Sequence, residues 1–380
     1  MHVHAKKKDL LRVLGRCQAV ADKKSTMPVL GNVLLETNGT DQLRLAATDL
    51  VLGVNGEVAA RVDKPGSVAL GARDLYERMR MMPDGEVSIE ATEGATTTIR
   101  AAASARRYTV HGIPGEEFPA LPAPDQGTTM LELPVETLAK LLATTHFSIS
   151  NDETRLHLNS ALFEWEGERV RMVTTDGHRL SKMEIETPGR SAKASMLIPF
   201  KGVQALKRMC DDGVAEGEAD AAPVMKLCQS GPNAFFELAG LRFSVKLVDA
   251  QFPPYQQVVP EASEHSVRAP RLALADSLRA VSVAASDRTG GVKLTLGGGR
   301  IRFESESPES GAGFDEVPSD YDGDEITIGF NARYFLDVLG AIEDEEVVLG
   351  ISGDLDPAVI RPAGESTQQQ YLAVVMPMRI

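Results

Sequence analysis

Residues 32–50 read NVLLETNGTDQLRLAATDL, and the plan of this stretch decides the fold because it returns twice later in the chain. In its second half, Leu43, Leu45 and Ala47 alternate with other residues. Alternation with a period of two is typical of a strand with one buried face, and Asn38-Gly39 is a dipeptide typical of tight turns. The stretch therefore predicts two antiparallel strands joined by a hairpin.

Two further copies of this pattern follow. Residues 159–176, NSALFEWEGERVRMVTTD, begin about 127 residues after the first copy and have their turn at Glu166-Gly167. Residues 291–307, GVKLTLGGGRIRFESES, have a glycine-rich turn followed by alternating Ile301 and Phe303. Recurrence at such a long period predicts a triplicated domain and argues against a solenoid of short repeats.

Each copy also predicts two helices. One helix follows a short apolar strand and carries apolar residues three or four apart; we expect such pairs at residues 68–82, 196–210 and 326–340. The other helix opens each copy, at residues 7–21, 133–148 and 271–285, and Pro134 suits the first position of the second of these. The repeated order of helix, strands, helix, strands predicts an α+β fold class.

The chain therefore divides into three predicted domains. Pro-rich stretches at residues 116–122 and 250–260 suit the boundaries between them. We expect domain 1 at residues 1–124, domain 2 at 125–258 and domain 3 at 259–380.

The composition, 43% hydrophobic and 25% charged, is typical of a globular protein. No apolar run approaches the ~20 residues that a membrane span needs, and the N-terminal residues lack the pattern of a secretory signal. Cys17, Cys210 and Cys228 are odd in number and lack the spacing of zinc ligands. We expect a reducing, cytoplasmic location and no membrane partner.

The charge is unevenly distributed along the chain. The net charge is -14, and acidic residues gather at 211–220, 304–325 and 343–346. Residues 6–24, in contrast, hold seven Lys or Arg against two Asp. Basic helices on an acidic body could contact phosphates without reading sequence, but ordinary solvated surface explains any single one of these charges equally well.

The stretch TTDGHRL at residues 174–180 raises the question of an active site, because Asp176 and His178 could in principle form an acid/base pair. No second carboxylate or metal-ligand cluster accompanies them. Asp49 aligns with Asp176 in the first copy, yet leucine and valine follow it in place of glycine and histidine. The sequence does not support catalysis at this stretch.

The motifs of other active sites are absent from the sequence. No nucleophile elbow, P-loop, zinc-protease motif or dinucleotide-binding fingerprint occurs, and the glycines of GGGR at 297–300 belong to a hairpin. His2 and His4 are expected to fray with the N-terminus and to make a poor metal site. We expect no catalytic residue, no metal site and no cofactor.

At this point the chain resembles a known family, the beta subunit of bacterial DNA polymerase III, or sliding clamp. The resemblance runs along the whole chain. It is carried by MPVLGNVLLE (27–36), ATDL (47–50), RLHLNSALFE (155–164), TTDGHRL (174–180), KLVDAQFPPY (246–255), GFNARYFLDVL (329–339) and VVMPMRI (374–380). It implies three clamp domains, each with two helices inside and antiparallel sheets outside, and a head-to-tail dimeric ring around duplex DNA.

The resemblance also implies a pocket that accepts short peptides containing glutamine and leucine. Its implied residues are Leu158, Thr175, Gly177, His178, Arg179, Leu180, Pro253, Val258, Asn331, Tyr334, Leu355, Pro357, Val374, Val375, Met376, Pro377, Met378 and Arg379. Two departures from the family pattern affect these expectations. Gln257 replaces an arginine common at the pocket edge, and Leu156-His157 replace aromatic residues that contact DNA in some members.

Other positions carry over as DNA and subunit contacts. The implied DNA-facing cations are Lys24, Arg73, Lys201 and Lys207, and the implied dimer interface sets Tyr108 and Val110 against Val283 and Ala284.

The expected function is that of a non-catalytic processivity factor. Its implied partners are duplex DNA, a second copy of the chain, the replicative polymerase alpha subunit, the clamp loader, and other polymerases and repair proteins. Two alternatives stay open from the residues alone: a phosphoesterase built on Asp176 and His178, and an interaction protein unrelated to DNA. Neither alternative accounts for the triplication.

Overall fold

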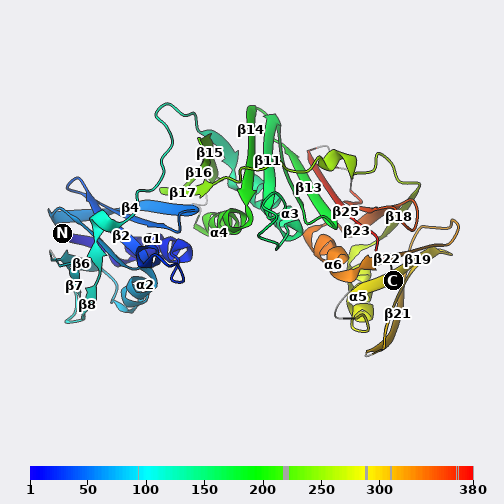
Figure 1. Ribbon diagram of the computed structural model, residues 1–380, viewed down its shortest axis with the longest axis horizontal. Helices are drawn as coiled ribbons and strands as arrows, with labels where there is room; N and C mark the ends of the chain where they lie inside the picture. The colour runs from blue at the N-terminus through cyan, green and yellow to red at the C-terminus, as the bar shows by residue number, and fades with distance from the viewer. Residues whose placement is uncertain are drawn as a thin grey trace. The chain divides into compact units, whose positions relative to one another are not determined.

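The computed structural model describes residues 1–92, 94–216, 222–286, 290–308, 310–364, 366 and 368–379. They form two compact units (Figure 1). Unit 1 contains Met1–Val135 with Gly213–Leu247, and unit 2 contains Glu136–Asp212 with Val248–Ile380. The end of the acidic run at 211–220 lies outside the described residues.

Unit 1 is built on one 13-stranded sheet whose main path runs β10-β15-β16-β17-β4-β1-β6-β7-β8, with β2, β3, β5 and β9 branching from it. Its strands are β1 (His2–Lys6), β2 (Asn32–Asn38), β3 (Gln42–Thr48), β4 (Leu52–Lys64), β5 (Ser67–Gly71), β6 (Glu86–Ala91), β7 (Thr96–Ala101), β8 (Arg107–His111), β9 (Ile113–Pro114), β10 (Leu131–Pro134), β15 (Val224–Ser230), β16 (Asn233–Leu238) and β17 (Leu241–Lys246). Helices α1 (Lys7–Val20) and α2 (Ala72–Met81) pack side by side against it (Figure 1).

Unit 2 contains an eight-stranded sheet, β14-β11-β12-β13-β25-β24-β23-β18, and a four-stranded sheet, β21-β20-β19-β22. Its strands are β11 (Ser160–Gly167), β12 (Arg169–Thr175), β13 (Arg179–Glu186), β14 (Ala192–Pro199), β18 (His265–Pro270), β19 (Gly291–Gly297), β20 (Arg300–Ser307), β21 (Gly311–Pro318), β22 (Ile326–Asn331), β23 (Glu346–Ile351), β24 (Ala358–Pro362) and β25 (Gln369–Val375). Its helices are α3 (Val135–Thr145), α4 (Phe200–Glu216), α5 (Arg271–Ser282) and α6 (Ala332–Ala341), and α5 packs beside α6.

The repeat predicted from sequence is present in the structure. The three hairpins are β2–β3, β11–β12 and β19–β20, and the three strand–helix pairs are β5–α2, β14–α4 and β22–α6. The helices that open the copies are α1, α3 and α5. The strand pairings within the described residues are antiparallel, which confirms the α+β fold class.

Two local predictions were wrong by one residue. Glu166 pairs with Arg169, so the second hairpin turns at Gly167-Glu168, where Gly167 has a φ of 61°. Glycine adopts this left-handed conformation without strain, which explains the shift of the turn by one position. Pro134 is the last residue of β10, where it pairs with Val224, and α3 begins at the next residue, Val135, so Pro134 does not take the first helical position.

The sheets continue across the predicted domain boundaries. Strand β17 pairs with β4, joining residues of the predicted first and second domains, and β13 pairs with β25, joining the second and third. Backbone hydrogen bonds thus link parts of the chain that the repeat separates. The boundaries at 124/125 and 258/259 stay predictions.

The prediction that His2 and His4 fray was wrong. They lie in β1, which pairs with β4 on one side and β6 on the other. Val3 is fully buried, and the Met1 amino group donates a hydrogen bond to the Ala91 carbonyl, 3.1 Å away. Sheet pairing on both sides and burial of alternate side chains hold the segment in place.

The three cysteines are free and buried, as expected for packing residues. Burial raises the pKa of Cys17 to about 12. No helix in the described part of the chain is long and apolar enough to cross a membrane.

Candidate functional site

The TTDGHRL stretch forms the turn between β12 and β13, and its Thr-Asp pair builds that turn. Thr175 Oγ1 donates to the Arg179 carbonyl at 2.7 Å and accepts from the Gly177 N–H at 3.1 Å. Asp176 Oδ1 accepts from the backbone N–H groups of His178 and Arg179, at 2.9 and 3.0 Å. Gly177 has a φ of 92°, which favours glycine at this position.

The same turn occurs in unit 1 after β3. Thr48 Oγ1 donates to the Leu52 carbonyl at 2.7 Å and accepts from the Leu50 N–H at 3.0 Å. Asp49 Oδ1 accepts from the Val51 and Leu52 N–H groups, at 3.0 and 2.6 Å. The Thr48-Asp49 turn has the same hydrogen bonds as the Thr175-Asp176 turn, although no histidine follows Asp49. We therefore assign Asp176 a structural role in its turn. Side chains of this type commonly bond their own backbone in turns.

Arg179 ties the turn to helix α6. Its side chain is only 9% exposed, and its Nε donates to Asp176 Oδ2 at 3.0 Å while Nη1 donates to Asp337 Oδ2 at 2.6 Å. The guanidinium also lies 4.5 Å from the centre of the Tyr334 ring. Burial raises the pKa of the Tyr334 hydroxyl above its usual value, and the Asp176 carboxylate adds to this rise. Arg179 therefore supports the site from beneath its surface.

Substitutions of Asp176 separate its two roles. Asp176→Asn keeps an oxygen for the backbone N–H groups but removes the charge beside Arg179. We expect it to lower the free energy of unfolding by roughly 1–2 kcal/mol. Asp176→Ala removes both the backbone hydrogen bonds and the mostly buried ion pair with Arg179. We expect it to lower the free energy of unfolding by roughly 3 kcal/mol. Calorimetry should rank the melting temperatures native, Asn, Ala. Equal melting temperatures for all three proteins would contradict the structural task of Asp176.

The C-terminal strand brings VVMPMRI beside this turn. In the β13–β25 ladder, Leu180 lies opposite Val374. The Met376 N–H donates to the His178 carbonyl at 2.9 Å, and the Met378 N–H donates to the Gly329 carbonyl at 2.8 Å. Strand β24 continues the sheet by pairing Ala358 with Val375, which places the Leu355–Pro357 loop at the same end.

These segments combine a buried apolar floor with an exposed rim. Leu180, Val374, Val173 and Tyr255 form one buried cluster, against which Phe252 packs. Of the residues implied by the resemblance, Leu158, Thr175, Arg179, Leu180, Val374 and Val375 are buried; Pro253, Asn331, Tyr334, Pro357, Pro377 and Met378 are half-buried; Gly177, His178, Val258, Leu355, Met376 and Arg379 are exposed. Asn331 has a local task as well, because its Oδ1 caps α6 by accepting the Arg333 N–H at 3.0 Å.

A cavity that sequence reasoning missed lies next to this cluster. Its volume is about 680 Å³, and Tyr255 and Val259 line it together with Lys182 and Leu372. Lys182 and Leu372 pair directly, two residues along from Leu180 and Val374, so all four side chains share one face of the sheet. The apolar cluster and the cavity thus form a continuous surface. The pairing of β13 with β25 creates it, and no local motif signals it.

The residues implied as DNA and subunit contacts lie elsewhere. Lys24 and Arg73 are exposed in unit 1, while in unit 2 Lys201 is exposed and Lys207 forms an ion pair with Asp211 at 3.2 Å. Tyr108 and Val110 lie on edge strand β8 of unit 1, and Val283 and Ala284 follow α5 in unit 2. Val110 and Ala284 are largely buried within their own units.

Comparison with known proteins adds independent findings. Three family models match successive parts of the chain: the DNA polymerase III beta subunit N-terminal domain at residues 1–122, its central domain at 132–254 and its C-terminal domain at 256–379. The beta sliding clamp of Caulobacter vibrioides is 30% identical over 377 residues, 98% of both chains. The crystal structure of the DNA polymerase III subunit beta from Pseudomonas aeruginosa has a TM-score of 0.90 at 28% identity, with full coverage of both chains. A sliding clamp from the same organism, solved bound to griselimycin, has a TM-score of 0.89 at 28% identity, again with full coverage.

Proposed function

Because this chain belongs to the DNA polymerase III beta subunit family, and so is a non-catalytic DNA polymerase processivity clamp, we propose how its own residues hold DNA and partners. Two copies close head to tail around duplex DNA, and the surface between Leu180 and Met376 receives partner peptides. The ring itself performs no chemistry. It acts by keeping a bound enzyme at high effective concentration on DNA.

The apolar floor beside an exposed methionine carries the peptide proposal. Leu180 and Val374 are buried in one cluster, and Met376 stands exposed at its edge. Methionine adapts to differently shaped ligands, and Gly177, whose φ of 92° favours glycine, presents no side chain at the turn. Peptides containing glutamine and leucine fit such a site, because apolar side chains enter the floor and polar groups reach the rim. Their sources are the replicative polymerase alpha subunit, the clamp loader, other polymerases and repair proteins.

Edge strands support the ring. Strand β8 ends the sheet of unit 1, and β21 ends the four-stranded sheet of unit 2. An edge strand presents unpaired N–H and C=O groups that can continue a sheet in another chain. Arg107 on β8 and Arg106 just before it are exposed, whereas β21 carries Asp315 and Glu316 and no basic residue. Opposite charges on the two edges favour head-to-tail pairing over pairing of like ends.

Electron microscopy of the purified protein, with the solution mass measured on the same sample, tests ring formation. Particles with a central hole and about twice the chain mass of 40.9 kDa are expected. Compact particles without a hole, at the mass of one chain, would contradict the dimeric ring.

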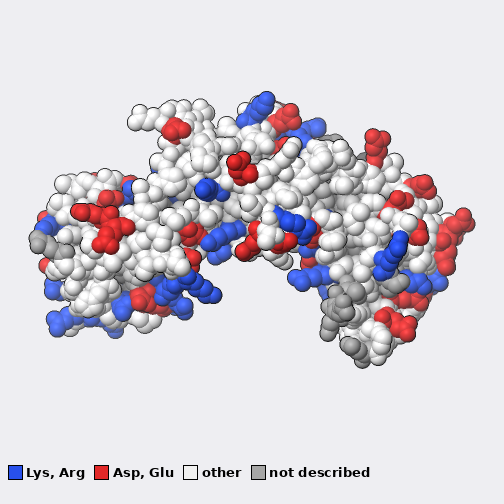
Figure 2. Space-filling model, in the orientation of Figure 1, with Lys and Arg blue, Asp and Glu red and all other residues white. Residues whose placement is uncertain are grey.

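Exposed cations on the helices and on the segment that follows α1 provide the DNA contacts. Figure 2 shows Lys and Arg side chains gathered over the part of unit 1 that carries α1 and α2. Such contacts to phosphate hold duplex DNA without reading its sequence. A net charge of -14 is compatible with this role because the attraction is local. The protein acts in the cytoplasm. Because the sequence contains no nucleotide-binding motif, an external ATP-driven loader opens the ring.

Neutralising these cations should weaken the salt dependence of DNA binding. Lys24→Ala and Arg73→Ala are each expected to lower the slope of log K against log salt by about 1, because each removes one phosphate contact. Anisotropy titrations of a labelled linear duplex over a series of salt concentrations measure this slope. Lys193→Ala is the matched control, since Lys193 is also exposed but lies on strand β14. A slope reduced as much by the control variant would overturn the assignment.

A further inference from the structure

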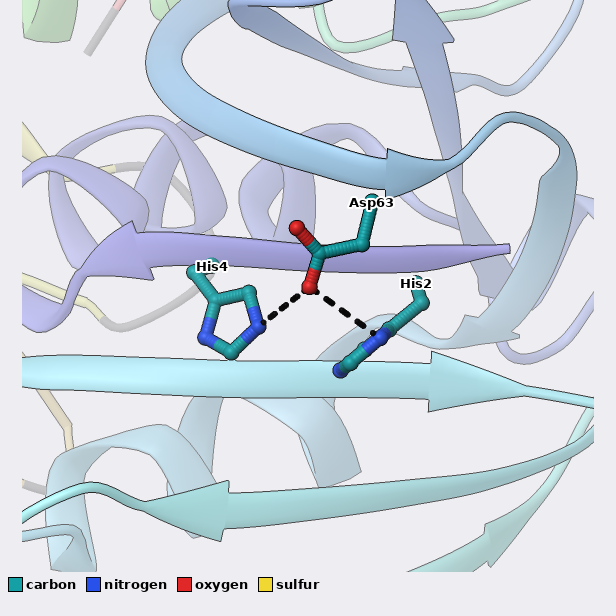
Figure 3. A group of neighbouring side chains, drawn as sticks. All are labelled: His2, His4 and Asp63. Atoms are coloured by element: carbon teal, nitrogen blue, oxygen red, sulfur yellow. Dashed lines mark hydrogen bonds and ion pairs between the residues drawn. The ribbon is translucent and has the colours of Figure 1, made fainter.

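The N-terminal strand places two histidines on one face of the sheet of unit 1. His2 and His4 are two residues apart in β1, and their side chains point to the same side (Figure 3). The register of β1 against β4 shifts between His2 and Val3, pairing them with Lys64 and Val62 and passing over Asp63. Such a bulge redirects a side chain, and the Asp63 carboxylate turns toward both imidazoles (Figure 3).

The three side chains converge on one point. His4 Nε2 lies 3.0 Å from Asp63 Oδ2, and His2 Nδ1 lies 3.4 Å from the same oxygen. Ligand atoms from all three residues lie within 4.8 Å of one another. Tetrahedral zinc with bonds of about 2.0–2.1 Å separates its ligand atoms by about 3.3 Å. The two distances to Asp63 already match that separation.

The outward-facing atoms of these groups are held by further side chains. His4 Nδ1 lies 3.5 Å from Glu86 Oε1, and His2 Nε2 lies 3.1 Å from Ser88 Oγ. Metal-binding histidines characteristically have their second ring nitrogen held by a carboxylate or another hydrogen-bonding group, which fixes the ring and its tautomer.

The Asp63 carboxylate is also held by a neighbouring side chain. Arg61 Nε donates to Asp63 Oδ1 at 3.2 Å, which leaves Oδ2 for the histidines. An aspartate side chain is ordinarily a carboxylate at neutral pH, which is the form that binds a metal ion. The histidine side chains are 31% and 16% exposed, so an ion can enter from solvent.

We propose that His2 Nδ1, His4 Nε2 and Asp63 Oδ2 bind a divalent transition metal, with zinc the best match, and leave one coordination position open to solvent. Two imidazoles and one carboxylate are typical zinc ligands, whereas magnesium and calcium prefer oxygen ligands. The ion joins β1 to β4 and thereby stabilises unit 1. Ring formation and peptide binding do not depend on this site.

Zinc titration of chelator-treated, tag-free protein by calorimetry tests the site. One zinc ion per chain and a rise in melting temperature are expected. His2→Ala/His4→Ala should abolish this binding, and Glu86→Gln should weaken it roughly tenfold while leaving the three ligands in place. The matched control is His111→Ala, which removes an exposed histidine from strand β8 of the same unit and should change nothing.

Cobalt provides a second readout that does not depend on stability. Tetrahedral cobalt gives strong visible absorption bands, which are expected in the native protein and absent from the double-histidine variant. Circular dichroism of that variant checks that it is folded. The proposal is overturned if zinc does not saturate at one ion per chain, or if the double variant or the His111 control binds zinc as the native protein does.

Discussion

Deletion of residues 376–380 is expected to abolish binding of partner peptides, with a loss of at least roughly 100-fold in affinity. The deletion removes Met376 and Met378, whose backbone N–H groups hold the segment against His178 and Gly329. It leaves Val374 in the β13–β25 ladder, so the floor of the site and the fold are retained. Anisotropy titration of a labelled peptide containing glutamine and leucine measures the change.

Two comparisons make this result specific. An unchanged melting temperature of the deleted protein shows that the loss does not come from unfolding. His178→Ala should weaken the peptide only modestly, since its side chain lies exposed at the rim. Equal peptide affinity before and after the deletion would contradict the assignment of the site to this surface.

Charges introduced at the end of unit 2 are expected to separate the dimer. Phe314 on edge strand β21 is 61% exposed, and Val283 is 80% exposed. The two lie close together in the fold, because a Cβ on Gly313 would come within 3.3 Å of the Ala284 side chain. Large exposed apolar groups beside an unpaired strand edge mark a surface that a partner covers. Phe314 was not among the interface residues implied by the sequence.

The variant Phe314→Asp/Val283→Asp should weaken dimerisation by roughly 100-fold or more, as expected when central apolar contacts are replaced by charges. Sedimentation velocity over a range of concentrations should then show a mass near 40.9 kDa at concentrations where the native protein dimerises. Leu272→Asp is the control, because Leu272 is similarly exposed but lies eleven residues earlier, about 16 Å along the helix. A native-like dimer in the double variant would exclude this edge as the interface.

Local patterns predicted the elements well. The alternation of Leu43 and Leu45 gave the strands, the helical spacing of apolar residues gave the helices, and the repeat gave their order. These patterns arise because one face of each strand or helix is buried, and they can be read within a few neighbouring residues. The exact position of a turn was harder to predict. At the second hairpin, the turn is at Gly167-Glu168, which became clear only from the strand pairing and the positive φ of Gly167.

Long-range pairing was not accessible in the same way. The contact of Arg179 with Asp337 spans 158 residues, and the β13–β25 ladder joins segments almost 200 residues apart. No local period encodes either. His2 and His4 illustrate the same limit, because Asp63 reaches them only through the register shift between β1 and β4. Resemblance to known clamps supplied the candidate site residues, and the structure shows which of them are buried and which are exposed.

Retention on circular and linear DNA distinguishes a closed ring from a protein held by surface contacts alone, since a closed ring is held by topology. The protein is placed on nicked circular plasmid by a bacterial clamp loader with ATP, and free protein is removed by gel filtration at high salt. The protein should stay with circular DNA and be lost when one restriction cut makes the DNA linear, because phosphate contacts alone are weak at high salt. Equal retention on circular and cut DNA, or none on either, would contradict a sliding ring.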